Sequence, residues 1–531
     1  MDYDTAESEG GRASEQHTGD WDEGARSMKF AHMADIHLGH RQYGLKQRED
    51  DMASSFRATL KLALQSDPDA ILLPGDLFDS RDLRPKVLEE AENALELVPD
   101  DVPVLVSRGN HDENLTPRDV TWLNFLHRRD QIVLLETALR GEGEAATFRP
   151  YDPDKDTGHA GFYDVETDAG TVRVYGLQWR GARTDTALTQ VARGIKKTNA
   201  DNGDPDYTVL LGHFGIEDEV PSLGGNVTHA ELREVRDVVD YLALGHIHKQ
   251  YSSSDWIFNP GSPEAHNTQE AHEDWNHGYY EVTLSPASEG YDGPGRLAHS
   301  VNHHHSRRRP YFRPPAFDVT PYDTHGELFE AFRDHVTNHE SNLDSVLQQE
   351  EFLKGGDQRR PLVDLRFEGT LQFDRSEFST DELADLVEDA YDALYVQTNT
   401  SRVTSAEIEE LLKGLDDDEV FIDGRLQTEA LEQRVFETIA NESRFSERAE
   451  DVATILSDAH RMAKTNEDPK DITELVTQRR RELFADEAEN VMIDIDDDPF
   501  DDEAVEATDD AGTEASEPIG DGAGTGGGED E

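Results

Sequence analysis

The 531-residue sequence predicts a layered α/β fold for its first half, a smaller α+β unit after it and a mostly helical region before the end. The prediction depends on the spacing of apolar residues. From residue 28 to about residue 284, short apolar runs alternate with longer segments in which apolar residues recur every three to four positions. This alternation is typical of layered α/β domains, whose ligands bind where strands end and loops begin.

The strand-like runs are short stretches of Val, Ile, Leu and aromatic residues, bounded by residues that favour turns. Candidate strands cover residues 29–34, 70–74, 102–107, 131–135, 171–176, 207–212, 239–245 and 256–258. Helical spacing of apolar residues, which predicts amphipathic helices, covers residues 51–64 and 85–98.

The rest of the chain divides by composition. Residues 285–310 are predicted to be a linker, because they begin with a Gly, Pro and Ser-rich stretch and continue into a run of His and Arg. Residues 311–400 predict the α+β unit, with a strand at 362–367, and residues 401–485 predict helices. Both ends, residues 1–27 and 486–531, are predicted to be disordered; the second holds 19 acidic residues and no Lys or Arg.

The net charge of the chain is extreme. The sequence has 115 Asp and Glu against 50 Lys and Arg, which gives −65 at pH 7. A charge of this sign repels phosphates and argues against nucleic-acid partners in dilute salt. However, only 12 of the basic residues are Lys, and 38 are Arg. Few Lys beside many acids is typical of proteins in nearly molar salt, where the Debye length is about 3 Å and net charge says little about partners. We therefore expect a halophilic protein.

Two absences narrow the possible chemistry and location. The chain has no Cys, which excludes disulfides, thiolate metal sites and a Cys nucleophile. The sequence also has no apolar stretch near its start and no run of 18 apolar residues. We therefore expect a cytoplasmic, nucleoid-associated protein without a signal peptide or a membrane span.

Five short polar motifs follow predicted strands of the first domain. They are Asp35-Ile36-His37, Gly75-Asp76-Leu77-Phe78-Asp79, Gly109-Asn110-His111-Asp112, Gly212-His213-Phe214 and Gly245-His246-Ile247-His248. In four of them a Gly precedes the first polar residue, which lets the backbone turn sharply. In the first and last motifs the two polar residues are two positions apart, so a strand would present both on the same face.

The residue types in these motifs predict a pair of metal ions. Imidazole, carboxylate and amide ligands without thiolate suit Mn²⁺, Fe²⁺ or Zn²⁺ better than Mg²⁺. Seven candidate ligands are too many for one ion, whereas two ions that share a carboxylate would use them all. Such pairs bind phosphoryl oxygens and activate water in phosphoester hydrolysis. One such motif alone is more often a turn or a structural His, but five in order at strand ends favour a site.

The order of the motifs resembles that of the calcineurin-like metallophosphoesterase superfamily. Within it, the chain is most similar to the meiotic recombination eleven and SbcD family of double-strand-break repair nucleases. Met33-Ala34-Asp35-Ile36-His37-Leu38-Gly39 and Asn259-Pro260-Gly261-Ser262-Pro263 add to the similarity, which covers residues 28–284 well. The resemblance implies a sandwich of two sheets flanked by helices, followed by a capping domain and C-terminal helices.

The resemblance also implies roles for individual residues. One metal would be held by Asp35, His37 and His248, and the other by Asn110, His213 and His246. Asp76 would bridge the two ions. His111 would stabilise the transition state or protonate the leaving oxygen, and Asp112 would orient it.

The cofactors implied by the resemblance are two Mn²⁺ per subunit, with other divalent metals possible. The implied activities are exonuclease action on duplex DNA and endonuclease action on single strands. Some family members have a His at the position of Asp79, and that His is linked to exonuclease activity. The strength of the exonuclease is therefore left open by the sequence.

The partners implied by the resemblance are DNA ends, a second copy of the chain and an ABC-type coiled-coil ATPase. Residues 85–98 and 118–128 would pair two subunits, and the helices within residues 401–485 would dock on the ATPase. For DNA contact we predict arginines, whose planar fork binds phosphate through two bonds: Arg307, Arg308, Arg309, Arg313, Arg359 and Arg360. The alternative for this set is a solubilising basic linker.

Two other functions fit the same motifs. The chain could be a phosphatase or small-substrate phosphodiesterase of the same superfamily, in which case the residues after 285 would be unnecessary for activity. It could also be a scaffold that binds DNA ends with a vestigial site. All seven ligand positions and His111 are present, which argues against a vestigial site.

Overall fold

The computed structural model describes residues 27–113, 120–405 and parts of 421–483, with short gaps at 142, 155–157, 168, 221–226, 272–274, 288–292, 350–351 and 354–358. The described residues fall into two compact units, which are divided after residue 406. Apart from Ser27, the two ends predicted to be disordered lie outside the described residues. Within the described part of the chain, no helix is long and apolar enough to cross a bilayer.

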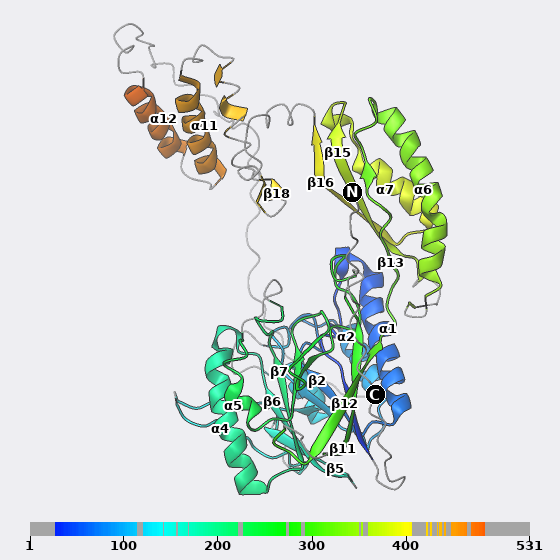
Figure 1. Ribbon diagram of the computed structural model, residues 1–531, viewed down its shortest axis with the longest axis vertical. Coiled ribbons are helices and arrows are strands. Elements are labelled where there is room, and N and C mark those ends of the chain that lie inside the picture. The colour runs from blue at the N-terminus through cyan, green and yellow to red at the C-terminus, as the bar shows by residue number, and fades with distance from the viewer. Residues whose placement is uncertain are drawn as a thin grey trace, which may run out of the picture. The chain divides into compact units, whose positions relative to one another are not determined.

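Two six-stranded sheets form the centre of the first domain (Figure 1). One has the order β12-β11-β1-β2-β3-β4 and comprises β1 (Met28–His32), β2 (Ala70–Pro74), β3 (Val104–Ser107), β4 (Val133–Leu134), β11 (Gly278–Pro286) and β12 (Leu297–His305). The other has the order β5-β6-β7-β8-β10-β9 and comprises β5 (Phe162–Thr167), β6 (Gly170–Leu177), β7 (Tyr207–His213), β8 (Tyr241–Gly245), β9 (Tyr251–Ser253) and β10 (Ile257–Asn259). Strands β1 to β4 are parallel, as are β6, β7, β8 and β10.

Helices cover the outer face of each sheet, so the domain has four layers. Figure 1 shows α1 (Lys46–Ala63) and α2 (Pro85–Leu95) on one side of the paired sheets, with α4 (Thr184–Asn202) and α5 (Arg233–Arg236) on the other. The short helix α3 (Trp122–Arg128) packs with α1 and α2 on the first sheet. The layered α/β fold predicted from the sequence is confirmed.

The pleat of the strands explains why their sequences are almost continuously apolar. In β1 and β2, Phe30 and Leu72 pack into the core between the sheets, whereas Ala31 and Ile71 pack into the core under the helices. Successive side chains of a strand point to opposite faces, and here both faces are buried. The apolar runs that predicted these strands therefore reflect two cores, one on each side of the sheet.

The predicted linker at residues 285–310 is wrong for its central part. Residues 297–305 form β12, which pairs antiparallel with β11 from Pro286 opposite Leu297 to Gly278 opposite His305. Leu297 and Val301 pack on the core between the sheets, and the His299 ring lies 5.8 Å from Tyr241 and 5.4 Å from Phe258 of the same core. The strand is held mainly by its backbone pairing with β11. Its sequence is therefore mostly polar and lacks the apolar run by which the other strands were predicted. The same pairing places His303, His304 and His305 in a strand.

A second domain, which we call the cap, follows β12 and has a parallel sheet with two helices. The sheet comprises β13 (Tyr311–Phe312), β14 (Phe317–Asp318), β15 (Leu362–Leu371) and β16 (Tyr395–Ser405). Helices α6 (His325–Leu347) and α7 (Thr380–Tyr391) pack on one face, where Val363 and Phe367 of β15 contact Phe332 and Leu383. Strand β16 ends at Ser405, so the cap continues at least five residues beyond the boundary predicted from the sequence.

The second unit of the chain contains helices α11 (Ala449–Lys464) and α12 (Pro469–Leu483). It also contains a short hairpin of β17 (Phe421–Ile422) and β18 (Arg425–Leu426). The two helices fall within the region whose apolar spacing predicted helices.

A buried ion network joins the cap to the first domain. Arg309, a predicted DNA contact, is fully buried, and its Nη2 lies 2.9 Å from Oδ1 of Asp51 on α1. Arg48, also fully buried, lies 2.6 Å from Asp51 and 3.1 Å from Glu264. The DNA-contact prediction for Arg309 is therefore wrong. Its charge is compensated inside the protein, where an unpaired guanidinium would cost several kcal/mol.

We predict that Asp51→Asn lowers the free energy of unfolding by about 3 to 5 kcal/mol, because it leaves two buried guanidinium groups with one fewer counter-charge. Chemical denaturation in concentrated KCl measures this change. Glu330→Gln is the control, because Glu330 pairs with Arg333 on the exposed surface of α6. An Asp51→Asn effect no larger than that of the control would contradict the buried network.

A second prediction concerns His32, which lies between the two sheets. Its Nε2 donates to the Leu244 carbonyl at 3.0 Å, and its Nδ1 lies 2.9 Å from the Tyr241 hydroxyl. Burial lowers the pKa of His32 to about 3. The unfolded chain therefore binds a proton near pH 6.5 that the folded chain does not bind. Below that pH, His32 should reduce stability by about 1.4 kcal/mol per pH unit.

The test compares His32→Gln, which keeps a donor for the Leu244 carbonyl but does not titrate, with the native chain. The stability of the variant relative to the native chain should rise as the pH falls from 6.5 towards 4. His339→Gln on α6 is the matched control. Parallel pH profiles for the native chain and His32→Gln would rule out this role for His32.

Candidate metal centre

The five polar motifs meet at one edge of the sandwich. Asp35 and His37 follow β1, Asp76 follows β2, and Asn110 follows β3; His213 ends β7, and His246 and His248 follow β8. Because these strands are parallel within each sheet, their carboxyl ends lie at the same edge. The structure therefore brings together the seven residues that the sequence singled out as metal ligands.

The backbone at this edge is strained. Four of the seven residues have positive φ angles, which non-glycine residues rarely adopt: Asp35 (54°), His37 (47°), Asp76 (52°) and His246 (91°). Two glycines allow the close packing. A Cβ atom on Gly75 would clash with the His213 ring, and one on Gly109 would clash with Asp76. Each strained residue costs of order 1 to 3 kcal/mol, and such strain gathers at functional sites.

One half of the site is built around the Asn110 side chain. Its Oδ1 lies 3.0 Å from Nε2 of His213 and 3.1 Å from Nδ1 of His246. The same Nε2 of His213 lies 3.1 Å from Oδ2 of Asp76. Four possible ligand atoms therefore lie close together: Oδ1 of Asn110, Nε2 of His213, Nδ1 of His246 and Oδ2 of Asp76.

The other half of the site is built around His37. This side chain is only 2% exposed, and among the described residues neither ring nitrogen makes a hydrogen bond of good geometry, although its Nδ1 lies 3.4 Å from Oδ1 of Asp79. Its ring lies 5.0 Å from that of His248 and 4.7 Å from that of His111. Its Nε2 lies 3.5 Å from Oδ2 of Asp76, the carboxylate that also faces His213. A buried imidazole whose Nδ1 faces the Asp79 carboxylate and whose Nε2 faces the Asp76 carboxylate fits a residue that binds a cation.

Hydrogen bonds fix the orientation of three imidazoles. Nδ1 of His213 donates to the Pro74 carbonyl at 2.8 Å, and Nδ1 of His248 lies 3.0 Å from Oε1 of Glu270. Nδ1 of His111 donates to the Asp79 carbonyl at 2.7 Å. In each ring Nε2 is left with its lone pair available when the imidazole is neutral. Metal-binding histidines generally donate their other N–H in this way.

The electrostatics of the site favour positive charge at His213 and His248 but not at His246. Burial opposes protonation of His213, but the nearby carboxylates, Asp76 first, raise its pKa to about 9. Burial is likewise outweighed at His248, where Glu270 raises the pKa to about 9. Burial and then the charge of His213 lower the pKa of His246 to about 4. Burial would raise the pKa of Asp76, but His213 holds it below its usual range. Such a field is suited to a cation.

Asp112 does not orient His111, so that prediction is wrong. The Asp112 carboxylate accepts hydrogen bonds from the backbone N–H groups of Asp76 at 2.8 Å, Gly109 at 3.1 Å and Phe78 at 3.2 Å. Because its side chain turns back under the loops after β2 and β3, it cannot reach the His111 ring, whose Nδ1 is bonded to a carbonyl. Burial, and then the charge of Asp76, raise the pKa of Asp112 to about 6.

Sequence reasoning missed three residues near His37 and His248. The buried ring of His266 lies 4.5 Å from that of His37 and 4.1 Å from that of His248. Glu270 contacts His248 and accepts from the His266 backbone N–H at 2.8 Å. Nδ1 of His40 lies 3.1 Å from Oδ1 of Asp79. The only sequence signal for His266 and Glu270 is that they follow the Asn259-Pro260-Gly261-Ser262-Pro263 motif.

The predicted DNA-contacting arginines other than Arg309 lie in different surroundings. The guanidinium of Arg308 lies over the Phe352 ring at 4.9 Å, and Nε of Arg313 lies 2.7 Å from Asp364. Nε of Arg360 lies 3.1 Å from Asp392. Arg307 and Arg359 are exposed. Of these, Arg308 and Arg313 line a common cavity between the first domain and the cap.

Comparison with known proteins identifies the class of this site. Residues 28–250, which carry all seven residues, match the family model of the calcineurin-like phosphoesterases. This part of the chain is a calcineurin-like metallophosphoesterase domain.

Its similarity to one group within that class is more specific. The chain is similar to archaeal proteins described as "DNA double-strand break repair protein Mre11". The protein of Archaeoglobus fulgidus is 29% identical over 254 residues, 46% of this chain and 52% of that protein. The protein of Aeropyrum pernix is 44% identical over 105 residues, 18% of this chain and 24% of that protein. The chain thus spans about half the length, or less, of these relatives.

Solved structures add little. The calcineurin-like phosphoesterase YfkN from Bacillus subtilis aligns with 52% of this chain and 90% of that chain, at 13% identity and a TM-score of 0.33. A score this low supports no argument about function.

We predict that Asp112→Asn lowers the free energy of unfolding of the metal-free protein by about 1 to 3 kcal/mol, because an amide cannot accept all three backbone N–H groups. Asp389→Asn on the exposed face of α7 is the control. The loss should be the same in the native and His111→Ala backgrounds, since the two side chains do not interact. A coupling between the two substitutions would instead support the orienting role inferred from the sequence.

Proposed function

We propose that this protein is a metal-dependent nuclease that processes the ends of DNA double-strand breaks. The observation that carries the proposal is the convergence of seven His, Asp and Asn side chains at one edge of a phosphoesterase domain that is similar to archaeal Mre11 proteins. The geometry supports phosphodiester hydrolysis, and the similarity supports DNA as the substrate.

Two divalent cations, which we propose to be Mn²⁺, fit the residues present. Asp35, His37 and His248 would hold one, Asn110, His213 and His246 the other, and Asp76 would bridge them. Asp76 belongs to two clusters of possible ligands, one with His37 and one with His213, which supports a bridging role. Two such cations bind phosphate oxygens, lower the pKa of a bound water and neutralise charge during an in-line displacement.

His111 is proposed to act on the substrate. Its N–H bond to the Asp79 carbonyl holds the ring, and its edge-to-face contact with His37 holds it beside the proposed metal ligands. A protonated Nε2 in this position would stabilise charge on the phosphate or protonate the leaving oxygen. The backbone oxygen of Asp79 positions His111. This role does not depend on which side chain is present at position 79.

The proposed assembly uses surfaces that remain exposed in the single chain. On and before α3, Val120 is 57% exposed and Trp122 36%, as expected of residues that a second copy would cover. We propose that an ABC-type ATPase docks on α11 and α12, where Leu456 is 36% exposed and Val476 37% exposed. Five of the predicted arginines remain candidates for DNA contact: the exposed Arg307 and Arg359 and the partly buried Arg308, Arg313 and Arg360. We also retain the proposals of a halophilic protein and of a location on the chromosomal DNA.

The test measures Mn²⁺-dependent hydrolysis in concentrated KCl, with labelled duplex DNA and a small phosphodiester as alternative substrates. We expect the native chain to degrade DNA. His111→Gln should reduce the rate by about 10²- to 10⁴-fold, the usual contribution of a general acid, with its bound metal unchanged. His339→Gln on α6 should retain full activity.

Each other outcome identifies a different function. Cleavage of the small ester alone would indicate a phosphodiesterase of the same superfamily. Binding of DNA ends without any hydrolysis, although metal is bound, would indicate a scaffold.

A further inference from the structure

A third imidazole lies beside the pair formed by His37 and His248. The ring of His266 is 4.1 Å from that of His248 and 4.5 Å from that of His37, and both contacts are edge to face. One ring nitrogen of each of these three histidines lies within 4.8 Å of the other two. The seven residues proposed as metal ligands do not include His266, so this residue has no role yet.

One nitrogen of the His266 ring is buried without a partner. The residue is 8% exposed, and among the described residues none forms a hydrogen bond with its Nε2. Buried polar atoms generally keep a partner, because burial removes the hydrogen bonds that water would make. A cation bound at this nitrogen would replace the lost water, as it does for other metal-binding imidazoles.

Glu270 holds two of the three imidazoles in place. Its Oε1 lies 3.0 Å from Nδ1 of His248, and its Oε2 accepts from the backbone N–H of His266 at 2.8 Å. Asn267 donates to the same carboxylate at 2.8 Å, and its own Oδ1 accepts from the Glu270 backbone N–H at 3.0 Å. Carboxylates in this position orient the imidazoles that bind metals. His266 therefore shares its support with a residue already proposed as a ligand.

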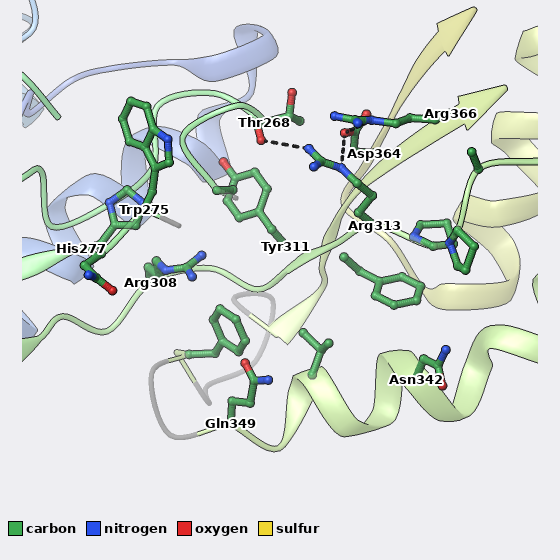
Figure 2. Close-up of a pocket in the computed structure, with 18 of the residues that line it drawn as sticks. Thr268, Trp275, His277, Arg308, Tyr311, Arg313, Asn342, Gln349, Asp364 and Arg366 are labelled. Atoms are coloured by element: carbon green, nitrogen blue, oxygen red, sulfur yellow. Dashed lines mark hydrogen bonds and ion pairs between the residues drawn. The ribbon is translucent and has the colours of Figure 1, made fainter. Parts of the chain in front are cut away.

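The loop that carries His266 is also held from the side of the cap. Figure 2 shows Thr268, whose carbonyl accepts from Arg313 at 3.4 Å, and His277 farther along the chain. Nε2 of His277 lies 2.9 Å from the carbonyl oxygen of Glu270. Contacts on both sides of the loop thus fix its path. The approach of the His266 ring to His37 and His248 is therefore built into the fold.

An added imidazole would make the two halves of the metal centre unequal. With His266, the half around His37 would have three imidazoles, whereas the half around Asn110 has two, from His213 and His246. Imidazole ligands suit Zn²⁺ and Fe²⁺, whereas Mn²⁺ is better matched by oxygen ligands. The half around His37 should therefore discriminate more strongly against Mn²⁺ than the half around Asn110.

We propose that His266 binds, through Nε2, the same cation as His37 and His248. The inference rests on the proposed function, because it adds a ligand to one of the two cations proposed there. It differs in sign from a role in packing. A packing residue stabilises the chain without metal, whereas a ligand with an unpartnered nitrogen stabilises the chain only when the metal is bound.

The test titrates Co²⁺, whose absorption spectrum reports its ligands, into the metal-free full chain in concentrated KCl. His266→Phe keeps a flat ring and removes the nitrogen. The affinity for one Co²⁺ should fall at least about 10- to 100-fold, the loss caused by removing even an outer partner of a ligand. In the proton NMR spectrum of the Co²⁺-loaded variant, one strongly shifted ring N–H signal of the native chain should be missing. His266→Gln, which adds no apolar ring, should change the affinity in the same direction.

Thermal unfolding separates a ligand from a packing residue. The Tm of metal-free His266→Phe should equal or exceed that of the native chain, because the variant buries no unpartnered nitrogen. The rise in Tm on saturation with Co²⁺ should be smaller in the variant than in the native chain. His339→Phe is the control, because His339 belongs to none of the clusters of possible ligands among the described residues. It should leave the Co²⁺ affinity unchanged.

Equal Co²⁺ affinity of the native chain and His266→Phe, with the same number of shifted signals, would overturn the proposal. A lower Tm of the metal-free variant with unchanged Co²⁺ affinity would assign His266 to packing and overturn it as well. Hydrolysis of DNA, measured on the same proteins, distinguishes this inference from the proposed function. Weaker Co²⁺ binding by the variant, without DNA hydrolysis by the native chain, supports the ligand and overturns the nuclease. DNA hydrolysis by the native chain, with unchanged Co²⁺ binding by the variant, overturns only the ligand.

Discussion

The position of the Asp76 carboxylate is the constraint on which the metal centre depends. Its backbone N–H is held by Asp112, and its Oδ1 accepts from the His111 backbone N–H at 2.9 Å. Its Oδ2 is left to face His213 and His37, which come from different sheets. A carboxylate fixed in this way can belong to both halves of the site only if the two sheets stay in register. Packing in the core between the sheets therefore determines whether Asp76 can face both His213 and His37.

The sequence predicted the parts of this site that local rules determine. A strand that is buried on both faces has a continuous apolar sequence. A polar residue directly after such a strand must lie at the edge of the sheet. His213 and Asp76 were found in this way. His266 and Glu270 were not, because the loop after β10 has no period and only its tertiary path brings them to His248. Asp112 was misassigned because adjacency to His111 in sequence says nothing about side-chain direction.

The arginines also show that sequence alone does not predict the surroundings of a side chain. Arg307, Arg308 and Arg309 are adjacent in the sequence, and composition treats them alike as a basic run. In the structure one is exposed, one lies over an aromatic ring and one is fully buried against Asp51. The burial of a guanidinium and the identity of its partner decide whether it stabilises the fold or can bind a ligand. Neither can be predicted from composition.

The buried network also links the seat of the cap to the metal centre. Glu264 accepts from the backbone N–H of Arg309 at 2.8 Å and from Arg48 at 3.1 Å, so it holds both domains. It begins the short segment that continues to Glu270, which orients His248. A segment tied at one end by buried charges and at the other by an imidazole cannot move freely. One short segment therefore contacts both the buried ion network at the cap and the imidazole of His248.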